Sequence, residues 1–361
     1  MKKLSCHRGV ALITVMLVVA LASILATQMT AKLQLQLQRS INIESNQQAY
    51  WYAMGAEAFT KRILTLSFEG EETVTHLGQF WAQGENSYPV EYGDITGEIT
   101  DLQSCLNLNA LRAESGSAIV SDTSTTTPSL LSDTDTVSDT DTAASKSTTG
   151  TVSNDNLAAA SLERLILAIG IENVSSFEAK DMVDALTDWL DDNDLITNNG
   201  GAEDNDYSSL EYPYLAANNY LGSINELRTV AHYTRDIIEE LKPYVCVIPN
   251  SNLHQINVNT IDPDHSAILS ALLDITDDVA NDIISGRGEE GYQTIDDVFA
   301  LPQLSAVQIE DEMKNQLVVD SEYFKLKTKT TFNDSYFFLN SIMKVEQNNQ
   351  INIISRTIGR D

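Results

Sequence analysis

The first thirty residues, MKKLSCHRGVALITVMLVVALASILATQMT (Met1–Thr30), decide how this chain is organised. A short basic leader ends at Gly9, and no charged residue follows until Lys32. A run of about 20 apolar residues is long enough for a helix to cross the hydrocarbon core of a bilayer. We therefore predict a leader at residues 1–9 and a membrane-spanning helix at residues 10–30.

The position of Gly9 distinguishes this segment from an ordinary secretory signal. Such a signal carries its small-residue cleavage site after the apolar run, whereas Gly9 precedes it. Cleavage after Gly9 would leave the apolar segment on the mature protein, with Val10 as its first residue. From the leader alone, a plain membrane anchor or an uncleaved signal is the alternative.

The leader resembles the class III leader of type IV pilins and of type II secretion pseudopilins. The residues that carry the resemblance are Lys2, Lys3, Arg8, Gly9 and Val10. The resemblance implies that a prepilin peptidase cuts after Gly9 and that Val10 becomes N-methylated.

One position departs from the common pattern of these families. The fifth residue after the cut is usually Glu, and here it is Thr14. Within these families, the missing Glu implies the minor pseudopilin K family (general secretion pathway protein K), the large subunit at the fibre tip. A Glu can pair with the charged amine of a neighbouring subunit at the edge of the apolar phase. The Thr14 hydroxyl can only bond back to its own helix, which fits a subunit with no other subunit ahead of it.

The composition indicates an exported protein. The 361 residues carry a formal net charge of −30, which argues against nucleic acid and anionic membrane surfaces as partners. It favours cation binding or a soluble domain outside the cytoplasm. Because bases precede the apolar run, we expect the N-terminus to stay in the cytoplasm and the bulk of the chain to be exported. The resemblance implies a single-pass protein of the bacterial inner membrane with its large C-terminal domain in the periplasm.

The cysteines agree with this compartment. Cys6 lies in the leader, so Cys105 and Cys246 remain as one pair after cleavage. In an oxidising periplasm we predict that they form a disulfide. Two buried free thiols are the alternative.

Beyond the membrane run, good helix formers continue to about Leu66, and we predict one helix from Val10 to Leu66. Residues 32–38 alternate with a period of two, as a strand would, but no turn residue separates them from the apolar run. Residues 121–155 contain 25 Ser, Thr or Asp in 35 positions, so we predict a disordered insertion there.

The remaining chain contains two helical units and closing strands. Apolar residues recur at spacings of three and four between Ala158 and Leu241 and again between Ile256 and Leu304. The second unit resembles a helix-hairpin-helix or SAM-like unit. Alternation predicts antiparallel strands near the C-terminus. We therefore predict an α+β fold, in which a pilin-like long N-terminal helix packs on an antiparallel sheet that a large, mostly helical insertion interrupts.

The predicted organisation is a leader (1–9), a membrane helix (10–30), the pilin-like helix with the first strands (31–110), the disordered insertion (121–155), a helical insertion domain (158–315) and the C-terminal strands (316–361). The resemblance to the minor pseudopilin K family covers nearly all of the mature chain. Beyond the leader, it rests on Cys105-Leu-Asn-Leu-Asn, Gly200-Gly-Ala-Glu-Asp and Ile256-Asn-Val-Asn-Thr.

The acidic loop from Asp191 to Asp206 is the best candidate for a site. Calcium takes six to eight oxygen ligands from carboxylates, amides and carbonyls, and this loop is rich in them, but an EF-hand pattern does not match. The resemblance implies calcium sites within the helical insertion. The candidate ligands are Glu203 and Asp204, followed by Asp191, Asp194, Asp206 and Asn218. A solvated acidic loop without metal is the alternative.

Nothing in the chain predicts catalysis or nucleic-acid binding. The helix-hairpin-helix-like segment carries Arg287 as its only Lys or Arg, whereas phosphate binding needs basic residues. His232, His254 and His265 are scattered and lack the spacing of a metal site, and no Gly-x-Ser-x-Gly elbow occurs. We expect a protein that is not an enzyme.

The predicted function is that of a minor pseudopilin at the tip of the type II secretion pseudopilus. It would help to start pseudopilus assembly and the export of folded proteins. The resemblance implies minor pseudopilins I and J, major pseudopilin G, the prepilin peptidase and the inner-membrane assembly platform as partners. A minor pilin of a type IV pilus is the closest alternative, and a membrane-anchored periplasmic hydrolase is another.

Overall fold

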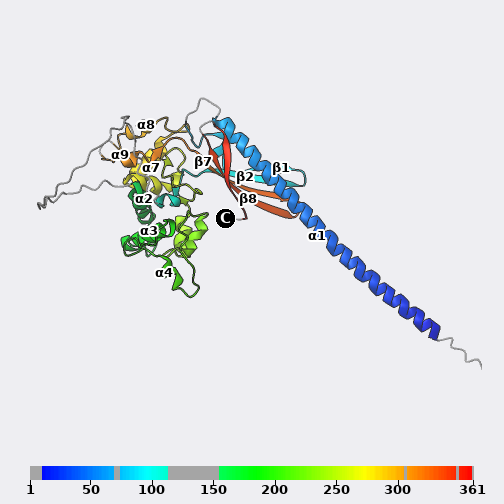
Figure 1. Ribbon diagram of the computed structural model, residues 1–361. Coiled ribbons are helices and arrows are strands. Elements are labelled where there is room, and N and C mark those ends of the chain that lie inside the picture. The colour runs from blue at the N-terminus through cyan, green and yellow to red at the C-terminus, as the bar shows by residue number, and fades with distance from the viewer. Residues whose placement is uncertain (1–9, 69–73, 113–153, 305–306, 347–348, 360–361) are drawn as a thin grey trace, which may run out of the picture. The chain divides into compact units, whose positions relative to one another are not determined.

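The computed structural model describes residues 10–68, 74–112, 154–304, 307–346 and 349–359 (Figure 1). The leader with Gly9 and most of the 121–155 insertion lie outside the described residues, so the predictions made for them stay predictions. The chain forms two compact units. The first, here called the helix–sheet unit, comprises residues 1–71, 79–100 and 324–361, and the second, the helical unit, comprises residues 72–78 and 101–323.

Helix α1 (Val10–Phe68) is continuous over 59 residues, which confirms the predicted long helix and extends it by two residues. The alternating stretch at residues 32–38 is part of it, because local helix formers continue on both sides. Every described side chain from residue 11 to residue 44 is exposed. The Thr14 hydroxyl donates to the Ala11 carbonyl at 2.9 Å, so its hydrogen bond stays within the helix, as a membrane segment requires.

The sheet has the strand order β1-β2-β7-β8-β9. Its strands are β1 (Asn86–Val90), β2 (Gly93–Asp101), β7 (Tyr323–Phe332), β8 (Ser335–Val345) and β9 (Ile351–Ile358). The pairs β1–β2 and β8–β9 are antiparallel. Neighbours β2 and β7 are separated in sequence by most of the helical unit, which confirms that a helical insertion interrupts the sheet.

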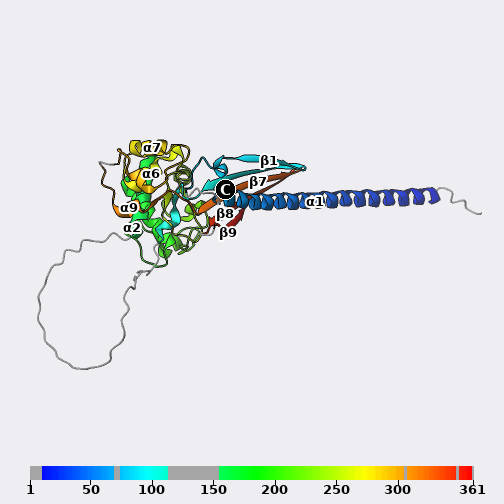
Figure 2. The same cartoon turned by 90° about the horizontal axis from the view of Figure 1, so that it is seen from above.

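The second half of α1 packs on this sheet, and Figure 2 shows the first half continuing beyond the strands. Three alanines of α1, Ala49, Ala53 and Ala56, are buried. Their small side chains allow the helix backbone to approach the strands closely, and the Thr330 hydroxyl donates to the Ala49 carbonyl at 2.7 Å. The core below is mainly apolar, formed by Leu64, Trp81, Phe324, Leu326, Met343, Val345 and Ile351.

The helical unit is built from short helices. They are α2 (Asn154–Ile169), α3 (Ser176–Leu190), α4 (Asp204–Ser208), α5 (Arg235–Leu241), α6 (Ala267–Leu273), α7 (Asp277–Gly286), α8 (Ile295–Phe299) and α9 (Asp311–Lys314). Helix α2 packs against both α3 and α6, so the two helical units predicted from the sequence share one apolar core. Helix α2 also takes in the last two residues of the predicted 121–155 insertion.

Two short parallel strand pairs connect distant parts of the helical unit. Strand β3 (Leu106–Asn107) pairs with β4 (Val245–Cys246), and β5 (Ile256–Asn257) pairs with β6 (Leu317–Val318). Leu106 and Leu317 belong to its core, and the compact helical unit comprises residues 72–78 and 101–323. It is therefore wider than the 158–315 segment expected from helical periodicity alone.

Candidate functional site

The acidic loop folds back on the C-terminal end of helix α3. The backbone N–H of Thr197 donates to both oxygens of Asp188, at 3.0 and 3.1 Å. The Asn198 side-chain amide donates to Asp184 Oδ1 at 2.9 Å. Asp184, Asp188 and the C-cap residue Asp191 are all buried. This fold-back brings the carboxylates of α3 close to the loop that follows it.

Gly201 makes the close approach possible. A Cβ atom built on Gly201 would overlap the Asp188 carboxylate and the Thr197 backbone. Any larger residue would push the loop off α3. The neighbouring Gly200 carbonyl lies 3.2 Å from His232 Nε2, so a residue far along the chain also holds the loop.

Glu203 is the most unusual residue of this site. Only 2% of it is exposed, and neither carboxylate oxygen has a hydrogen-bond partner among the described residues. Burial, together with the nearby carboxylates of Asp188 and Asp191, raises the pKa of Glu203 to about 7. The charged form of a carboxylate in such a place is destabilising unless the group takes up a proton or a cation neutralises it.

The other candidate ligands differ in their burial and in their hydrogen bonds. The carboxylate of Asp204 accepts from the Ala216 amide at 3.0 Å, and that of Asp206 accepts from the Glu203 amide at 3.1 Å. Asp194 is exposed. Asn218, in contrast, has a buried side-chain oxygen without a partner in the part of the chain described here.

Burial also raises the pKa of Asp191, although its Oδ1 accepts from the Asn193 amide at 3.0 Å. Asp188 was not among the candidates from the sequence. The signal for it was the spacing of Asp184, Asp188 and Asp191, which places all three near one face of α3.

These residues fit a calcium ion in chemistry. All offer hard oxygen donors, and two of them, Glu203 and Asn218, have buried oxygens without partners. No three His, Cys, Asp or Glu side chains converge as a ready metal-ligand set within the described ranges. Calcium, however, also takes carbonyl and amide oxygens, so carboxylates are only part of the possible donor set.

Cys105 and Cys246 form a disulfide with a Cα–Cα distance of 5.7 Å, which confirms the predicted bridge. The residues that follow Cys105 are structural. The Asn109 side-chain amide donates to the carbonyls of Leu221 and Ile248, each at 3.0 Å. The Cys-Leu-Asn-Leu-Asn motif thus fastens the start of the helical unit to a distant segment.

The Ile256-Asn-Val-Asn-Thr motif has a similar role. The Asn259 side chain accepts from the Tyr292 amide at 2.7 Å and donates to the Tyr292 carbonyl at 3.0 Å. The Thr260 hydroxyl donates to Asp101 at 2.5 Å, and the Ser321 hydroxyl donates to the same carboxylate oxygen at 2.6 Å. Burial raises the pKa of Asp101 to about 6, although the two hydrogen bonds lower it.

The helix-hairpin-helix-like hairpin uses its single base internally. The Arg287 guanidinium donates to the backbone carbonyls of Val258 and Ile261, at 3.3 and 2.5 Å. A guanidinium engaged in this way is not presented to a phosphate. The geometry agrees with the expectation that this hairpin has a structural use.

The fold defines the class of protein. A long helix with an exposed, apolar N-terminal half and a second half packed on an antiparallel sheet is the architecture of a membrane-anchored, pilin-like protein. The most apolar 18-residue window of α1 has a mean hydropathy of 2.2 and is entirely unburied. A large helical unit inserted between two neighbouring strands is the distinguishing addition.

Comparison with known proteins gives the family. Two family models, both described as type II secretion system (T2SS), protein K, match residues 104–250 and 256–320. Type II secretion system protein K of Aeromonas hydrophila is 32% identical over 362 residues, which cover 98% of each chain. The protein of the same name from Klebsiella pneumoniae is 29% identical over 357 residues, covering 98% of this chain and 97% of that one.

A solved structure agrees. A chain in the crystal structure of the GspK-GspI-GspJ complex from the enterotoxigenic Escherichia coli type 2 secretion system superposes with a TM-score of 0.71 and 28% identity, covering 90% of this chain and 100% of that one. The chain described here belongs to the type II secretion system protein K family. It is therefore a minor pseudopilin, a structural component of that secretion system.

Proposed function

We propose that this protein is the tip subunit of the pseudopilus, where it forms a complex with the minor pseudopilins I and J above a shaft of major pseudopilin G. The observation that carries the proposal is α1, whose first half exposes apolar side chains along its whole length. Such a helix needs lipid and then other helices around it. A relative of the same fold was crystallised with two pseudopilins, which supports these partners.

The maturation of the chain follows from the same proposal. The prepilin peptidase cuts after Gly9, and Val10 becomes the N-methylated first residue of the subunit. The apolar half of α1 is inserted in the bacterial inner membrane, next to the assembly platform, and the folded units lie in the periplasm. The disulfide between Cys105 and Cys246 supports an oxidising compartment for the helical unit.

The action of the protein is mechanical. Thr14 offers no carboxylate to the amine of a subunit ahead of it, so the chain takes the first position, starts assembly and caps the fibre. Growth of the shaft from below then pushes folded substrates through the outer membrane. The polar groups that might suggest catalysis have structural partners, since Asp101 and Arg287 are both engaged, which supports a role without enzymatic activity.

One experiment tests this function. The full-length protein is purified from cells that express the whole secretion system, and its N-terminus and co-purifying chains are identified by mass spectrometry. We expect a methylated Val10 and pseudopilins I and J in stoichiometric amounts. An intact leader without pseudopilin partners would refute the proposal, and type IV pilins as the partners would support the alternative class.

We also propose that the helical unit binds calcium at the loop after α3. Glu203 is the central ligand, the carboxylates of Asp188, Asp191 and Asp194 are close enough to act on its charge, and Asn218, Asp204 and Asp206 are the further candidates. The support is the pair of unpartnered buried oxygens on Glu203. Calcium would neutralise the carboxylates that the fold-back brings together, and it would fix the loop on α3.

A further inference from the structure

An exposed loop, residues 209–215, follows α4 in the helical unit. Every side chain in it is exposed, and those of Leu210, Tyr212 and Leu215 are 46%, 79% and 62% exposed. A loop that buries so little apolar surface gains little to offset the entropy that is lost when it is ordered. It keeps one conformation only where its ends and a few of its side chains are fastened.

Both ends of this loop are fastened to α4. The Ser209 hydroxyl donates to the Asp206 carbonyl at 2.7 Å, and the Ala216 amide donates to the Asp204 carboxylate at 3.0 Å. Helix α4 has only five residues, so it is too short to be stable by itself. The position of α4, and with it that of the loop, is therefore set by what α4 contacts.

Three aromatic rings connect α3, α4 and the loop. The ring of Tyr214 in the loop stacks on that of Tyr207 in α4, with centroids 5.2 Å apart. The ring of Trp189 in α3 meets both edge-on, at 5.2 Å from Tyr207 and 6.3 Å from Tyr214. Stacked and edge-on pairs at these distances attract each other. We call these three side chains the aromatic cluster.

The two tyrosines of the aromatic cluster are also fixed at their hydroxyl groups. The Tyr214 hydroxyl donates to the Thr229 carbonyl at 2.9 Å, and that of Tyr207 accepts from the Ala231 amide at 3.2 Å. Because one short segment holds both hydroxyl groups, neither ring can shift without straining a hydrogen bond or the stack. A movement of α4 is therefore transmitted to Tyr214 and to the loop.

The aromatic cluster adjoins the acidic site. Trp189 directly follows Asp188 in α3, and Glu203 is the N-cap residue of α4. Burial raises the pKa of Tyr207 to about 12, and the charges of Asp188 and Glu203 add to this shift. The carboxylates of the site are therefore close enough to act on the ring that carries the stack.

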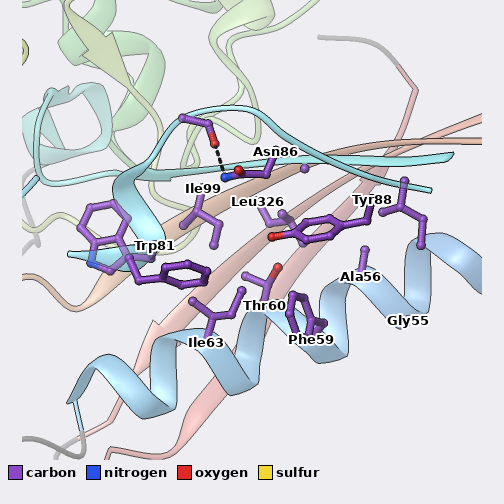
Figure 3. Close-up of a pocket in the computed structure, with 14 residues that line it drawn as sticks. Gly55, Ala56, Phe59, Thr60, Ile63, Trp81, Asn86, Tyr88, Ile99 and Leu326 are labelled. Carbon is purple, nitrogen blue, oxygen red and sulfur yellow. Dashed lines mark hydrogen bonds between the residues drawn. The ribbon is translucent and has the colours of Figure 1, made fainter. Parts of the chain in front are cut away.

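Buried charge makes a demand that buried space does not. The helix–sheet unit contains a cavity of about 150 Å³, lined mainly by apolar side chains such as those of Phe59, Ile63 and Tyr88 (Figure 3). An apolar cavity can stay empty. An ionised carboxylate as deeply buried as that of Glu203 requires a counter-charge. The acidic site, unlike the cavity, therefore needs a ligand.

Without a counter-charge, the acidic site works against the docking of α4. The carboxylates of Asp188, Asp191 and Asp194 all disfavour the charge on Glu203. The first two belong to the C-terminal end of α3, and Glu203 to the start of α4, so their repulsion acts to separate the two helices. The charge of Arg112 acts on Asp191 and offsets part of this repulsion. A bound cation would replace the remainder by attraction.

We propose that α4 docks firmly on α3 only when the acidic loop holds a calcium ion, and that the aromatic cluster passes this docking on to residues 209–215. This coupling rests on the calcium site proposed above. In the loaded protein the loop has one conformation, with Leu210, Tyr212 and Leu215 presented to the outside. Without calcium, α4 and the loop separate from α3 while the rest of the helical unit keeps its core.

Amide hydrogen exchange measures the order of the loop. The full-length protein is examined in detergent by mass spectrometry, with calcium chloride and with a chelator, at pH 8, which lies above the raised pKa of Glu203. Tyr214→Leu removes the ring stack. Tyr212→Leu is the matched control, because it makes the same substitution two residues away on a ring that is 79% exposed. Tyr214→Phe keeps the ring and removes only the hydrogen bond to Thr229.

In the wild type, we expect calcium to slow amide exchange in residues 209–216 by about tenfold or more. Tyr212→Leu and Tyr214→Phe should respond in the same way. Tyr214→Leu should bind calcium at least as tightly as the wild type in titration calorimetry, because ordering of the loop no longer opposes binding. Its loop should exchange at one rate, with or without calcium.

Each proposal fails by a different result. A wild type that gives no heat with calcium chloride would overturn the calcium site and this coupling with it. A wild type that binds calcium while its loop exchange stays unchanged would overturn the coupling alone, and this measurement decides even if Tyr214→Leu does not fold. A full response in Tyr214→Leu, an equal loss in Tyr212→Leu, or a lost response in Tyr214→Phe would overturn the role of the aromatic cluster.

Discussion

Arg356 on the last strand donates two hydrogen bonds to Glu57 in the second half of α1, from Nε to Oε2 at 2.7 Å and from Nη2 to Oε1 at 2.9 Å. Glu57 is buried, and the Ser341 hydroxyl also donates to it at 2.7 Å. Burial alone raises the pKa of Glu57, but the bonds from Arg356 and Ser341 outweigh it and hold the pKa below its usual value. The pair fastens β9 to the helix.

We predict that Arg356→Gln destabilises the full-length protein in detergent by about 1–3 kcal/mol at pH 7, because it leaves the buried Glu57 without a counter-ion. Because the pKa of Glu57 is lower in the folded protein than its unfolded value of about 4.5, the ionised group stabilises the fold above pH 4.5. This stabilisation is lost as the pH falls below that value. The difference between variant and wild type should therefore shrink below pH 4.5. Chemical unfolding at several pH values measures it. Lys327→Gln, which removes an exposed charge, should have little effect, and an equal loss in both variants would contradict the role of the pair.

Asp101 predicts a pH dependence of the opposite sign. Burial raises its pKa from 3.8 to about 6, so the folded protein prefers the neutral acid. The stability that the neutral Asp101 gives to the fold is fully present below pH 3.8 and is lost as the pH rises to about 6. Between these two pH values, the unfolding free energy of the wild type should fall by about 3 kcal/mol relative to that of Asp101→Asn.

Unfolding free energies of wild type and Asp101→Asn at pH 4 and pH 7 check this prediction. Asp320→Asn is the control, because Asp320 is exposed and only adds to the shift of Asp101 through its charge. Parallel pH profiles for wild type and Asp101→Asn would contradict a buried titrating carboxylate at this position.

Removal of the disulfide should destabilise the helical unit strongly. Cys105 and Cys246 are 141 residues apart, and cross-linking so long a loop restricts the unfolded chain considerably. We expect the Cys105→Ser and Cys246→Ser double variant to lose about 2–5 kcal/mol. Thermal unfolding with and without reductant measures the effect. Reductant should lower the unfolding temperature of the wild type to that of the variant, and insensitivity to reductant would be inconsistent with a stabilising bridge.

Calcium should stabilise the wild type and not Glu203→Gln. Without calcium, the variant should be the more stable of the two at pH 8. The raised pKa of Glu203, about 7, means that the folded wild type loses stability as pH rises from 4.5 to that value. With calcium the order should reverse, and the wild type should gain several degrees in unfolding temperature.

Scanning calorimetry measures the unfolding temperatures of wild type and Glu203→Gln, once with a chelator and once with calcium. Asp278→Asn, which removes an exposed carboxylate of α7, should respond to calcium like the wild type. An unchanged wild-type unfolding temperature on chelation would rule out the calcium site.

Thr14→Glu should relax the position of the subunit in the fibre. A carboxylate at this position can pair with the amine of a subunit ahead, so we expect the variant at internal positions as well as at the tip. Immunogold labelling of assembled fibres measures the distribution. Thr14→Gln is the neutral control and should remain at the tip, and identical labelling of wild type and Thr14→Glu would contradict the role given to Thr14.

Features that depend on local sequence were predictable. Helix α1 was predictable within two residues at its C-terminal end, because length, hydropathy and helix propensity act between close neighbours. The interrupted sheet was predictable from the order of alternating and helical segments. The single core of the helical unit was not, because periodicity identifies a buried face without showing which other face covers it.

The acidic loop shows the limit most clearly. From the sequence, its carboxylates differed little from one another. The fold separates them, because Asp204 and Asp206 accept hydrogen bonds from backbone amides, Asp194 is exposed, and Glu203 is buried without a partner. Asp188 joins the site only because the loop folds back on α3 past Gly201.

The sequence by itself determined the membrane helix and the order of helical and alternating segments, since composition and short-range periodicity encode these directly. Only the tertiary structure decided the bond between Glu57 and Arg356 and the burial of Asp101. The physical reason is that burial and pairing depend on which distant segments meet. Glu57 and Arg356 are 299 residues apart, so no local pattern joins them.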